Sequence, residues 1–141
     1  MSTVERMTQL QPAYTYAATV TGVHDGDTVA VDIDLGFGVH TIQHVRLLGC
    51  NAIELAQPGG VEARDHLASL FGLTSTSVNN LAHVVLRSVK VDKYGGRYDA
   101  AITLTNAGGG DLVTQLIADG WAAAWDGKGP KPVPPWPRAA V

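Results

Sequence analysis

The sequence predicts a fold of the α+β class that is mainly β, and three observations lead to this class. Five segments between residues 14 and 105 have the alternation or the β-branched and aromatic content of strands. Helical spacing of apolar residues occurs in two places, once between the third and fourth of these strands and once after the fifth. Sixteen glycines among 141 residues indicate many turns, and a 45% hydrophobic composition suffices for one ordinary core.

The first three strands are expected to form a meander. Residues 14–23 form the first strand, and the turn Asp25-Gly26-Asp27 follows, because Asp-Gly favours hairpin geometry. Residues 28–35 alternate strictly, which makes them the clearest strand in the chain. The predicted apolar face of this strand consists of Val29, Val31, Ile33 and Leu35. Gly36-Phe37-Gly38 then turns the chain into a third strand over residues 39–48.

A helix is expected over residues 61–71, after Pro58-Gly59-Gly60 ends the preceding loop. The apolar residues at helical spacing are Ala63, Leu67, Leu70 and Phe71. Gly72 is suited to end the helix, because glycine readily adopts the left-handed conformation of a helix C-terminus. A polar loop over residues 74–80 leads to the next strand.

Two further strands are expected over residues 81–91 and 97–105. A flexible connection over residues 105–110 then leads to a short helix, for which Asp111 is a good N-cap and Gly120 a C-terminal stop. The apolar pairs of this helix are Leu112 with Leu116 and Val113 with Ile117. Five short strands with a helix between the third and the fourth fit a five-stranded OB-type barrel, whose face and loops commonly bind nucleic acids.

The chain is expected to divide into three parts. Residues 1–13 form a loose, flexible leader, residues 14–126 form the barrel domain, and residues 127–141 form a Pro-rich C-terminal arm. The arm is expected to be extended rather than helical, because five of the seven prolines lie between residues 127 and 137.

Composition restricts the classes of function. A net charge of −3 and a pI near 5.9 argue against tight non-specific binding to long duplexes. Nine of the ten Lys and Arg residues lie from Arg46 onward, so the net charge does not exclude a local cationic surface. The single cysteine, Cys50, excludes an internal disulfide and a Cys-based zinc cluster. The sequence has no run of about 18 apolar residues and no signal-peptide pattern, so we expect a cytoplasmic protein without a membrane partner.

The end of the third strand gives the strongest chemical signal. Arg46 lies in the apolar stretch Val45–Leu48, and the chain turns at Gly49 before presenting the amide of Asn51 and the carboxylate of Glu54. Arg is rarely buried without a partner, and its rigid fork of donors suits planar oxyanions such as phosphate. This pattern indicates a phosphate site. Taken alone, Arg46 is explained equally well by an ion pair with a surface carboxylate.

Four ordered motifs together resemble the staphylococcal nuclease-like (thermonuclease) family over nearly the whole chain, from about Tyr14 to Trp125. They are Asp25-Gly26-Asp27-Thr28, Val45-Arg46-Leu47-Leu48-Gly49 followed by Glu54, Gly60-Val61-Glu62-Ala63, and Asp92-Lys93-Tyr94-Gly95-Gly96-Arg97. Taken singly, the first motif favours a turn and the last a polar hairpin loop. The resemblance implies an OB-type barrel and a phosphodiesterase that cleaves DNA or RNA with calcium. The members that the chain resembles are short, Pro-tailed proteins found among phages. This resemblance implies that the protein acts in the host cytoplasm if the chain is phage-encoded.

The resemblance also implies roles for individual residues. The implied calcium ligands are Asp27, Asn51 and the backbone carbonyl of Ala52. Glu54 would orient or deprotonate the attacking water, while Arg46 and Arg97 would hold the phosphate and stabilise the charge that develops on it. The implied nucleotide contacts are Lys93 and Tyr94. The implied roles agree with the chemistry of calcium, which takes oxygen ligands and polarises a phosphoryl group.

The chain departs from the family pattern in four ways. Asn51 stands where the family has a second ligating Asp, so the site loses one negative charge and its calcium affinity should fall. Ile53 replaces the usual proline and loosens the turn before Glu54, and Gly95-Gly96 inserts one residue before Arg97. The Pro-rich arm replaces a basic C-terminal helix. Together with the acidic balance, this last change favours single strands, ends or short oligonucleotides as substrates.

A second hypothesis from a different class is a catalytically weak barrel that binds nucleic acid or a protein partner. Asn51 favours this hypothesis, because an amide in place of a carboxylate weakens a metal site. The retention of Asp27, Glu54 and the two arginines favours the nuclease, because a binding module has no need of a carboxylate beside two guanidinium groups.

The remaining polar and aromatic candidates have simpler explanations. His40 and His44 share one face of a strand but lack a third ligand at suitable spacing, so surface histidines are favoured over a zinc site. Trp121 and Trp125 are expected to pack in the core or against the arm rather than stack on bases. Three basic residues of the arm either contact phosphates or only solubilise it, and these are Lys128, Lys131 and Arg138.

Overall fold

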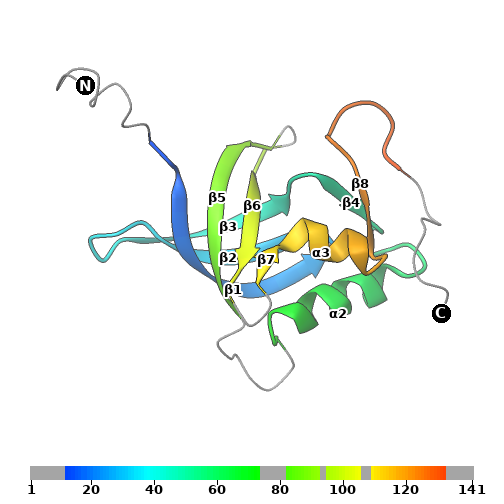
Figure 1. Ribbon diagram of the computed structural model, residues 1–141, viewed down its shortest axis with the longest axis horizontal. Coiled ribbons are helices and arrows are strands. Elements are labelled where there is room, and N and C mark those ends of the chain that lie inside the picture. The colour runs from blue at the N-terminus through cyan, green and yellow to red at the C-terminus, as the bar shows by residue number, and fades with distance from the viewer. Residues whose placement is uncertain (1–11, 74–81, 93–94, 106–108, 133–141) are drawn as a thin grey trace.

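The described part of the chain is built around a closed barrel of five strands (Figure 1). The structure is a computed structural model and describes residues 12–73, 82–92, 95–105 and 109–132. The barrel strands are β1 (Thr15–Asp25), β2 (Thr28–Asp34), β3 (His40–Leu47), β5 (His83–Val91) and β6 (Tyr98–Leu104). They pair in the order β3-β2-β1-β5-β6, and a parallel pairing of β3 with β6 closes the sheet. The predicted mainly β, α+β fold with an OB-type barrel is confirmed.

The meander of β1, β2 and β3 brings a turn residue next to a strand residue that is distant in sequence. β1 and β2 pair antiparallel, with Gly26 and Asp27 in the turn between them. The register of β2 with β3 sets Thr28 opposite Arg46, so Asp27 lies beside Arg46. A Cβ atom at Gly26 would lie 2.7 Å from the Cβ of Ala52, so a side chain has no room at this turn.

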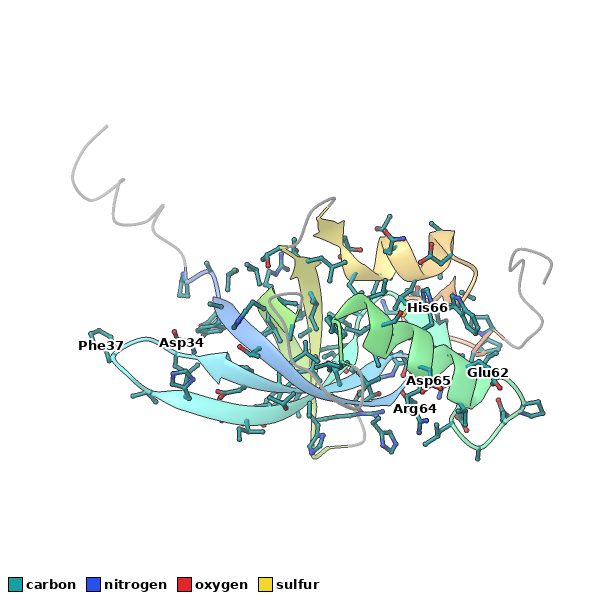
Figure 2. All side chains as sticks on the ribbon, turned by 90° about the horizontal axis from the view of Figure 1, so that it is seen from below. Asp34, Phe37, Glu62, Arg64, Asp65 and His66 are labelled. Atoms are coloured by element: carbon teal, nitrogen blue, oxygen red, sulfur yellow. The ribbon has the colours of Figure 1, made fainter. Side chains whose placement is uncertain are left out.

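Alternation along β2 buries one face of the strand inside the barrel. Three of the predicted apolar positions are buried, namely Val29, Val31 and Ile33. The prediction was wrong for Leu35, which is 41% exposed because β2 ends at Asp34 and the chain has already left the barrel wall. Beyond this point the β2–β3 hairpin projects from the barrel, with Phe37 at its tip (Figure 2).

The predicted first helix is α2 (Gly60–Leu70), which packs against the turn between β1 and β2. Ala63, Leu67 and the following Phe71 are buried, as their helical spacing predicted. Gly72 has a φ of 65° and ends the helix, as expected. The outer face of α2 carries exposed acidic residues, which Figure 2 labels as Glu62 and Asp65.

The predicted second helix is α3 (Leu112–Ala118), which lies beside α2 in both views (Figures 1 and 2). Asp111 caps its N-terminus, because the carboxylate accepts a hydrogen bond from the Thr114 amide at 2.9 Å. Trp121, which follows α3, stacks on His66 of α2 with ring centroids 5.2 Å apart. This packing role is the one expected for Trp121.

Three short strands were not predicted. β4 (Cys50–Ala52) pairs antiparallel with β8 (Ala122–Ala124), and β7 (Gly110–Asp111) adds to the end of β6. Segments of two or three residues are too short for a periodic pattern, so only tertiary pairing defines them. The β4–β8 pair matters for function, because it brings the C-terminal segment of the chain next to Asn51.

Several expectations lie outside the described residues. They concern residues 1–11 of the leader, the polar loop over residues 74–80, residues 106–108 of the connection and residues 133–141 of the arm. Among the helices that the structure describes, none is both long and apolar enough to cross a membrane.

Candidate metal and phosphate site

One pocket of about 240 Å³ collects the predicted metal ligands and catalytic residues that the structure describes. The predicted residues that line it are Asp27, Arg46, Asn51, Ala52, Glu54 and Arg97. They come from the β1–β2 turn, β3, β4, the loop after β4 and the β5–β6 connection. Asp25 and Lys131 also line the pocket. The predicted nucleotide contacts Lys93 and Tyr94 lie outside the described residues.

Asp27 is the buried carboxylate of the pocket. Its side chain accepts hydrogen bonds from the Ala52 amide at 3.0 Å and from the Thr28 hydroxyl at 3.2 Å. Burial, reinforced by the neighbouring charge of Asp25, raises the pKa of Asp27 to about 6. A cation bound here would offset the repulsion between the two carboxylates, so the charge arrangement suits a metal ion.

Arg46 is held at the floor of the pocket by several acceptors. Its Nη2 lies 3.5 Å from Asp27 Oδ2 and 3.3 Å from the Cys50 carbonyl oxygen. The guanidinium carbon also lies 5.4 Å from the ring centroid of Trp125. Arg46 is therefore paired with a buried carboxylate of the site, not with a surface carboxylate as the simpler interpretation proposed. Its orientation is fixed before any anion arrives.

Asn51 and Ala52 of β4 offer the two uncharged oxygens of the implied ligand set. The Asn51 side-chain Nδ2 donates to the Pro132 carbonyl oxygen at 3.2 Å, which leaves Oδ1 as the atom available to a cation. The N–H and C=O of one strand residue point to the same side of the strand, and the Ala52 N–H points to Asp27. The Ala52 carbonyl therefore faces the Asp27 side as well.

These oxygens fit calcium better than a transition metal. A carboxylate, an amide oxygen and a backbone carbonyl are ordinary calcium ligands, and water commonly completes the shell. Among the described residues there is no cluster of three or more His, Cys, Asp or Glu side chains that could hold a metal ion. The implied ligand set differs from such clusters because Asp27 is its only charged side chain. His40 is exposed and lies 2.9 Å from Asp32, as expected of a surface histidine.

The loop that presents Glu54 is braced by the start of α2. The Glu54 carbonyl accepts a hydrogen bond from the Gln57 amide at 2.9 Å. A Cβ atom at Gly60 would collide with the carbonyl oxygens of Glu54 and Leu55, so only glycine fits there. Ile53 is buried and anchors the turn by packing, so the turn before Glu54 is not loose as the replacement of a proline had suggested. The Glu54 side chain itself is exposed at the pocket.

Arg97 reaches the pocket in spite of the extra glycine before it. Gly95 and Gly96 have φ values of 71° and 72°, a left-handed conformation that two glycines adopt without strain. Arg97 Nε lies 3.3 Å from Oδ1 of the buried Asp92, which holds the guanidinium in place. The second predicted arginine is thus oriented by a carboxylate at the other end of the same loop.

Cys50 is buried beneath the pocket and has no role in its chemistry. Burial, followed by the charge of Asp27, raises the pKa of the Cys50 thiol to about 12. A thiol with this pKa stays protonated near neutral pH and is a poor nucleophile.

Asp99 is a buried acid beside the pocket, and no motif in the sequence singles it out. Its Oδ1 has no hydrogen-bond partner among the residues that the structure describes, and its Oδ2 lies 3.8 Å from Lys90 Nζ. Burial raises the pKa of Asp99, and a hydrogen bond and the charge of Asp92 raise it further, against smaller opposing effects of Lys90 and Arg46. The carboxyl group of Asp99 is therefore easier to protonate in the folded chain than in the unfolded chain.

We expect Asp99→Asn to change how stability depends on pH. A raised pKa in the folded state stabilises the parent below the unfolded pKa, and this contribution is lost as pH rises through the folded pKa. The variant cannot ionise at this position, so it should gain stability relative to the parent between acidic and neutral pH. Urea unfolding of both proteins across this range measures the difference. A difference that does not vary with pH would contradict the assignment.

Among the lining residues that were not selected as site residues, two carry a charge, Asp25 and Lys131. Asp25 belongs to a motif that the sequence displays, but its role as a second acid emerges only from the hairpin geometry. Lys131 was considered for a phosphate contact together with Lys128 and Arg138, but no pattern in the Pro-rich segment singled it out. Comparison with protein-family models and with curated proteins gives no match to this chain. The resemblance to the staphylococcal nuclease-like family stays a prediction, and the assignment of the site depends on the geometry above.

Proposed function

We propose that this protein is a calcium-dependent nuclease, a phosphodiesterase that hydrolyses DNA or RNA and acts on single strands or strand ends. The observation that supports it most is the convergence of two Asp carboxylates, the Glu54 carboxylate and two guanidinium groups on one pocket of about 240 Å³. A structural ion pair between Asp27 and Arg46 explains neither Glu54 nor Arg97 at the same pocket.

Asp27, Asn51 Oδ1 and the Ala52 carbonyl would hold the calcium ion. When bound, calcium supplies Lewis-acid polarisation of the phosphoryl group. The raised pKa of Asp27 shows that the folded chain holds this charge at a cost without a cation. The Asp27 hydrogen bond from the Ala52 amide fixes the two ligands relative to each other.

The hydrolysis proceeds by displacement at phosphorus. The Glu54 carboxylate takes a proton from a water molecule as the water oxygen attacks phosphorus, and the ester bond to the leaving oxygen breaks. The leaving oxygen takes a proton from solvent. Arg46 and Arg97 donate hydrogen bonds to the non-bridging oxygens, where negative charge grows in the transition state.

A strand end or a single strand suits this site better than a long duplex. The net charge of −3 provides no extended cationic surface for duplex backbones. The cations of the described pocket are instead local, and they are Arg46, Arg97 and Lys131. A few phosphates of a flexible strand are enough to engage all three.

The alternative is a catalytically weak module that binds nucleic acid or a protein through the same surface. The observation that favours it is the Asn51 amide, whose nitrogen is engaged by Pro132 and which leaves Asp27 as the only charged ligand of the implied set. Such a module would bind oligonucleotides with little dependence on Glu54.

A cleavage assay tests the proposal. Purified protein is incubated with end-labelled single-stranded DNA and with single-stranded RNA, in calcium or in excess chelator. We expect products in calcium from at least one substrate and none in chelator. Binding of the intact oligonucleotides without any cleavage would support the alternative and reject the nuclease.

We expect Asn51→Asp to tighten calcium binding, because it restores a negative charge to the ligand set. The same change removes the donor to Pro132, so the segment after β8 should be held less firmly. Isothermal titration with calcium measures the first effect. Unchanged or weaker affinity in a folded variant would argue that residue 51 is not a ligand.

A further inference from the structure

The chain returns to the pocket after β8. The Trp125 amide donates to the Gly49 carbonyl oxygen at 3.0 Å, and the Trp125 indole Nε1 donates to the Lys128 carbonyl oxygen at 3.0 Å. The latter bond closes a tight loop, and Pro132 then reaches Asn51. The described part of the arm, residues 127–132, is therefore fastened to the site at both ends.

Lys131 lies where this returning segment meets the pocket. It lines the pocket of about 240 Å³ and also an adjoining pocket of about 50 Å³, which Arg46 and Trp125 line as well. Its Nζ is 5.7 Å from the ring centroid of Trp125, the same ring that Arg46 approaches at 5.4 Å. Both cations therefore contact the Trp125 ring through cation–π interactions.

Lys131 differs from the two arginines in its ion pairing. Arg46 is paired with Asp27 and Arg97 with Asp92. Within the described residues, Lys131 forms no ion pair with a carboxylate. The ammonium group of Lys131 lines the same pocket of about 240 Å³ as Arg46 and Arg97, and this group of cations attracts an anion. Lysine suits a phosphate as a point charge rather than as a fork.

We propose that Lys131 binds the phosphate next to the scissile one, so that the site recognises a strand with consecutive phosphates rather than an isolated phosphodiester. This inference rests on the proposed function, because Arg46 and Arg97 are taken to hold the scissile phosphate. Trp125 positions Lys131, and the bond from Asn51 to Pro132 couples the arm to the metal corner. The arm therefore replaces a separate basic element in substrate binding.

Two substrates separate this role from general catalysis. One is a single-stranded oligonucleotide of about ten nucleotides, and the other is bis(p-nitrophenyl) phosphate, a phosphodiester without neighbouring phosphates. The variant Lys131→Gln removes the positive charge and keeps a polar side chain that is one atom shorter. We expect KM for the oligonucleotide to rise roughly 5- to 20-fold with little change in kcat, since a hydrogen bond to a charged group is lost at a partly solvated site. The preference for the oligonucleotide over the small diester should fall by the same factor.

The controls use the same segment of the chain. Lys128→Gln removes a charge from the same arm but not from the pocket, and should leave KM unchanged. Lys131→Arg keeps the charge and should restore most of the preference. Equal losses on both substrates would indicate a structural role and overturn the inference, as would an unchanged KM for the oligonucleotide. A rise in kcat/KM in Lys131→Gln would show that the arm obstructs the pocket and would also overturn it.

A binding measurement distinguishes failure of this inference from failure of the nuclease proposal. Fluorescence anisotropy with the labelled oligonucleotide is measured in calcium for Glu54→Gln with and without Lys131→Gln. If the parent never cleaves but Lys131→Gln still weakens binding about tenfold, the nuclease proposal fails and the phosphate contact stands. If cleavage is normal and binding does not depend on Lys131, the contact fails and the nuclease stands.

Discussion

Glu54→Gln is expected to lower calcium-dependent cleavage roughly 10²- to 10⁴-fold, the range of a general base. The change keeps the size and hydrogen-bonding capacity of the side chain but removes the group that takes a proton from water. Glu54 is exposed, and only its backbone carbonyl braces the loop through Gln57, so the fold should be unaffected. The turnover number with a single-stranded oligonucleotide measures the loss.

Glu62→Gln is the matched control for this prediction. Glu62 is an exposed glutamate in the first turn of α2 (Figure 2), and it does not line the pocket. The control should cleave like the parent, and both variants should unfold within about 0.5 kcal/mol of it. Full activity in folded Glu54→Gln would remove the proposed base from the mechanism.

Arg46→Lys is expected to lower kcat roughly 10²- to 10³-fold, similar to the loss of one preorganised donor to transition-state charge. Lysine keeps the positive charge but lacks the planar, forked guanidinium. It therefore cannot contact both Asp27 and the Cys50 carbonyl while lying over the Trp125 ring. The developing charge on phosphate would meet a single, less oriented donor. Steady-state kinetics in saturating calcium measure the effect.

Arg64→Lys serves as the control for Arg46→Lys. Arg64 lies on α2 and bonds to its neighbour Asp65 at 3.1 Å, outside the pocket. This variant should keep parental kcat and stability. If Arg46→Lys also kept parental kcat, a point charge would suffice at this position and the forked contact to phosphate would be excluded.

The parts of the fold that the sequence predicted are those that local chemistry determines. Alternation places Val31 inside the barrel, helical spacing places Leu67 against it, and the carboxylate of Asp111 caps α3. The predictions failed where a tertiary contact decides. β4 and β8 exist only because they pair with each other, and Leu35 is exposed because its strand ends one residue earlier.

The residues of the candidate site also fall into two groups, those that the sequence predicted and those that only tertiary contacts place. Asp27, Arg46 and Glu54 stand in motifs that resemble the staphylococcal nuclease-like family, and that resemblance implied that they converge on one site. Lys131 reaches the pocket through a pairing of two strands of three residues each and a turn fixed by Trp125. No local pattern encodes such a route. The buried Asp99 was not predicted for another reason. An acidic residue in an apolar strand has no periodic pattern that indicates its burial.

A crystal structure of Glu54→Gln with calcium and a short single-stranded oligonucleotide tests the account most directly, because the substrate should remain intact in this variant. We predict one calcium ion bound by Asp27, Asn51 Oδ1 and the Ala52 carbonyl, with a phosphate between Arg46 and Arg97. A calcium ion at another place, or an oligonucleotide bound on a different face of the barrel, would contradict the proposed site and the function inferred from it.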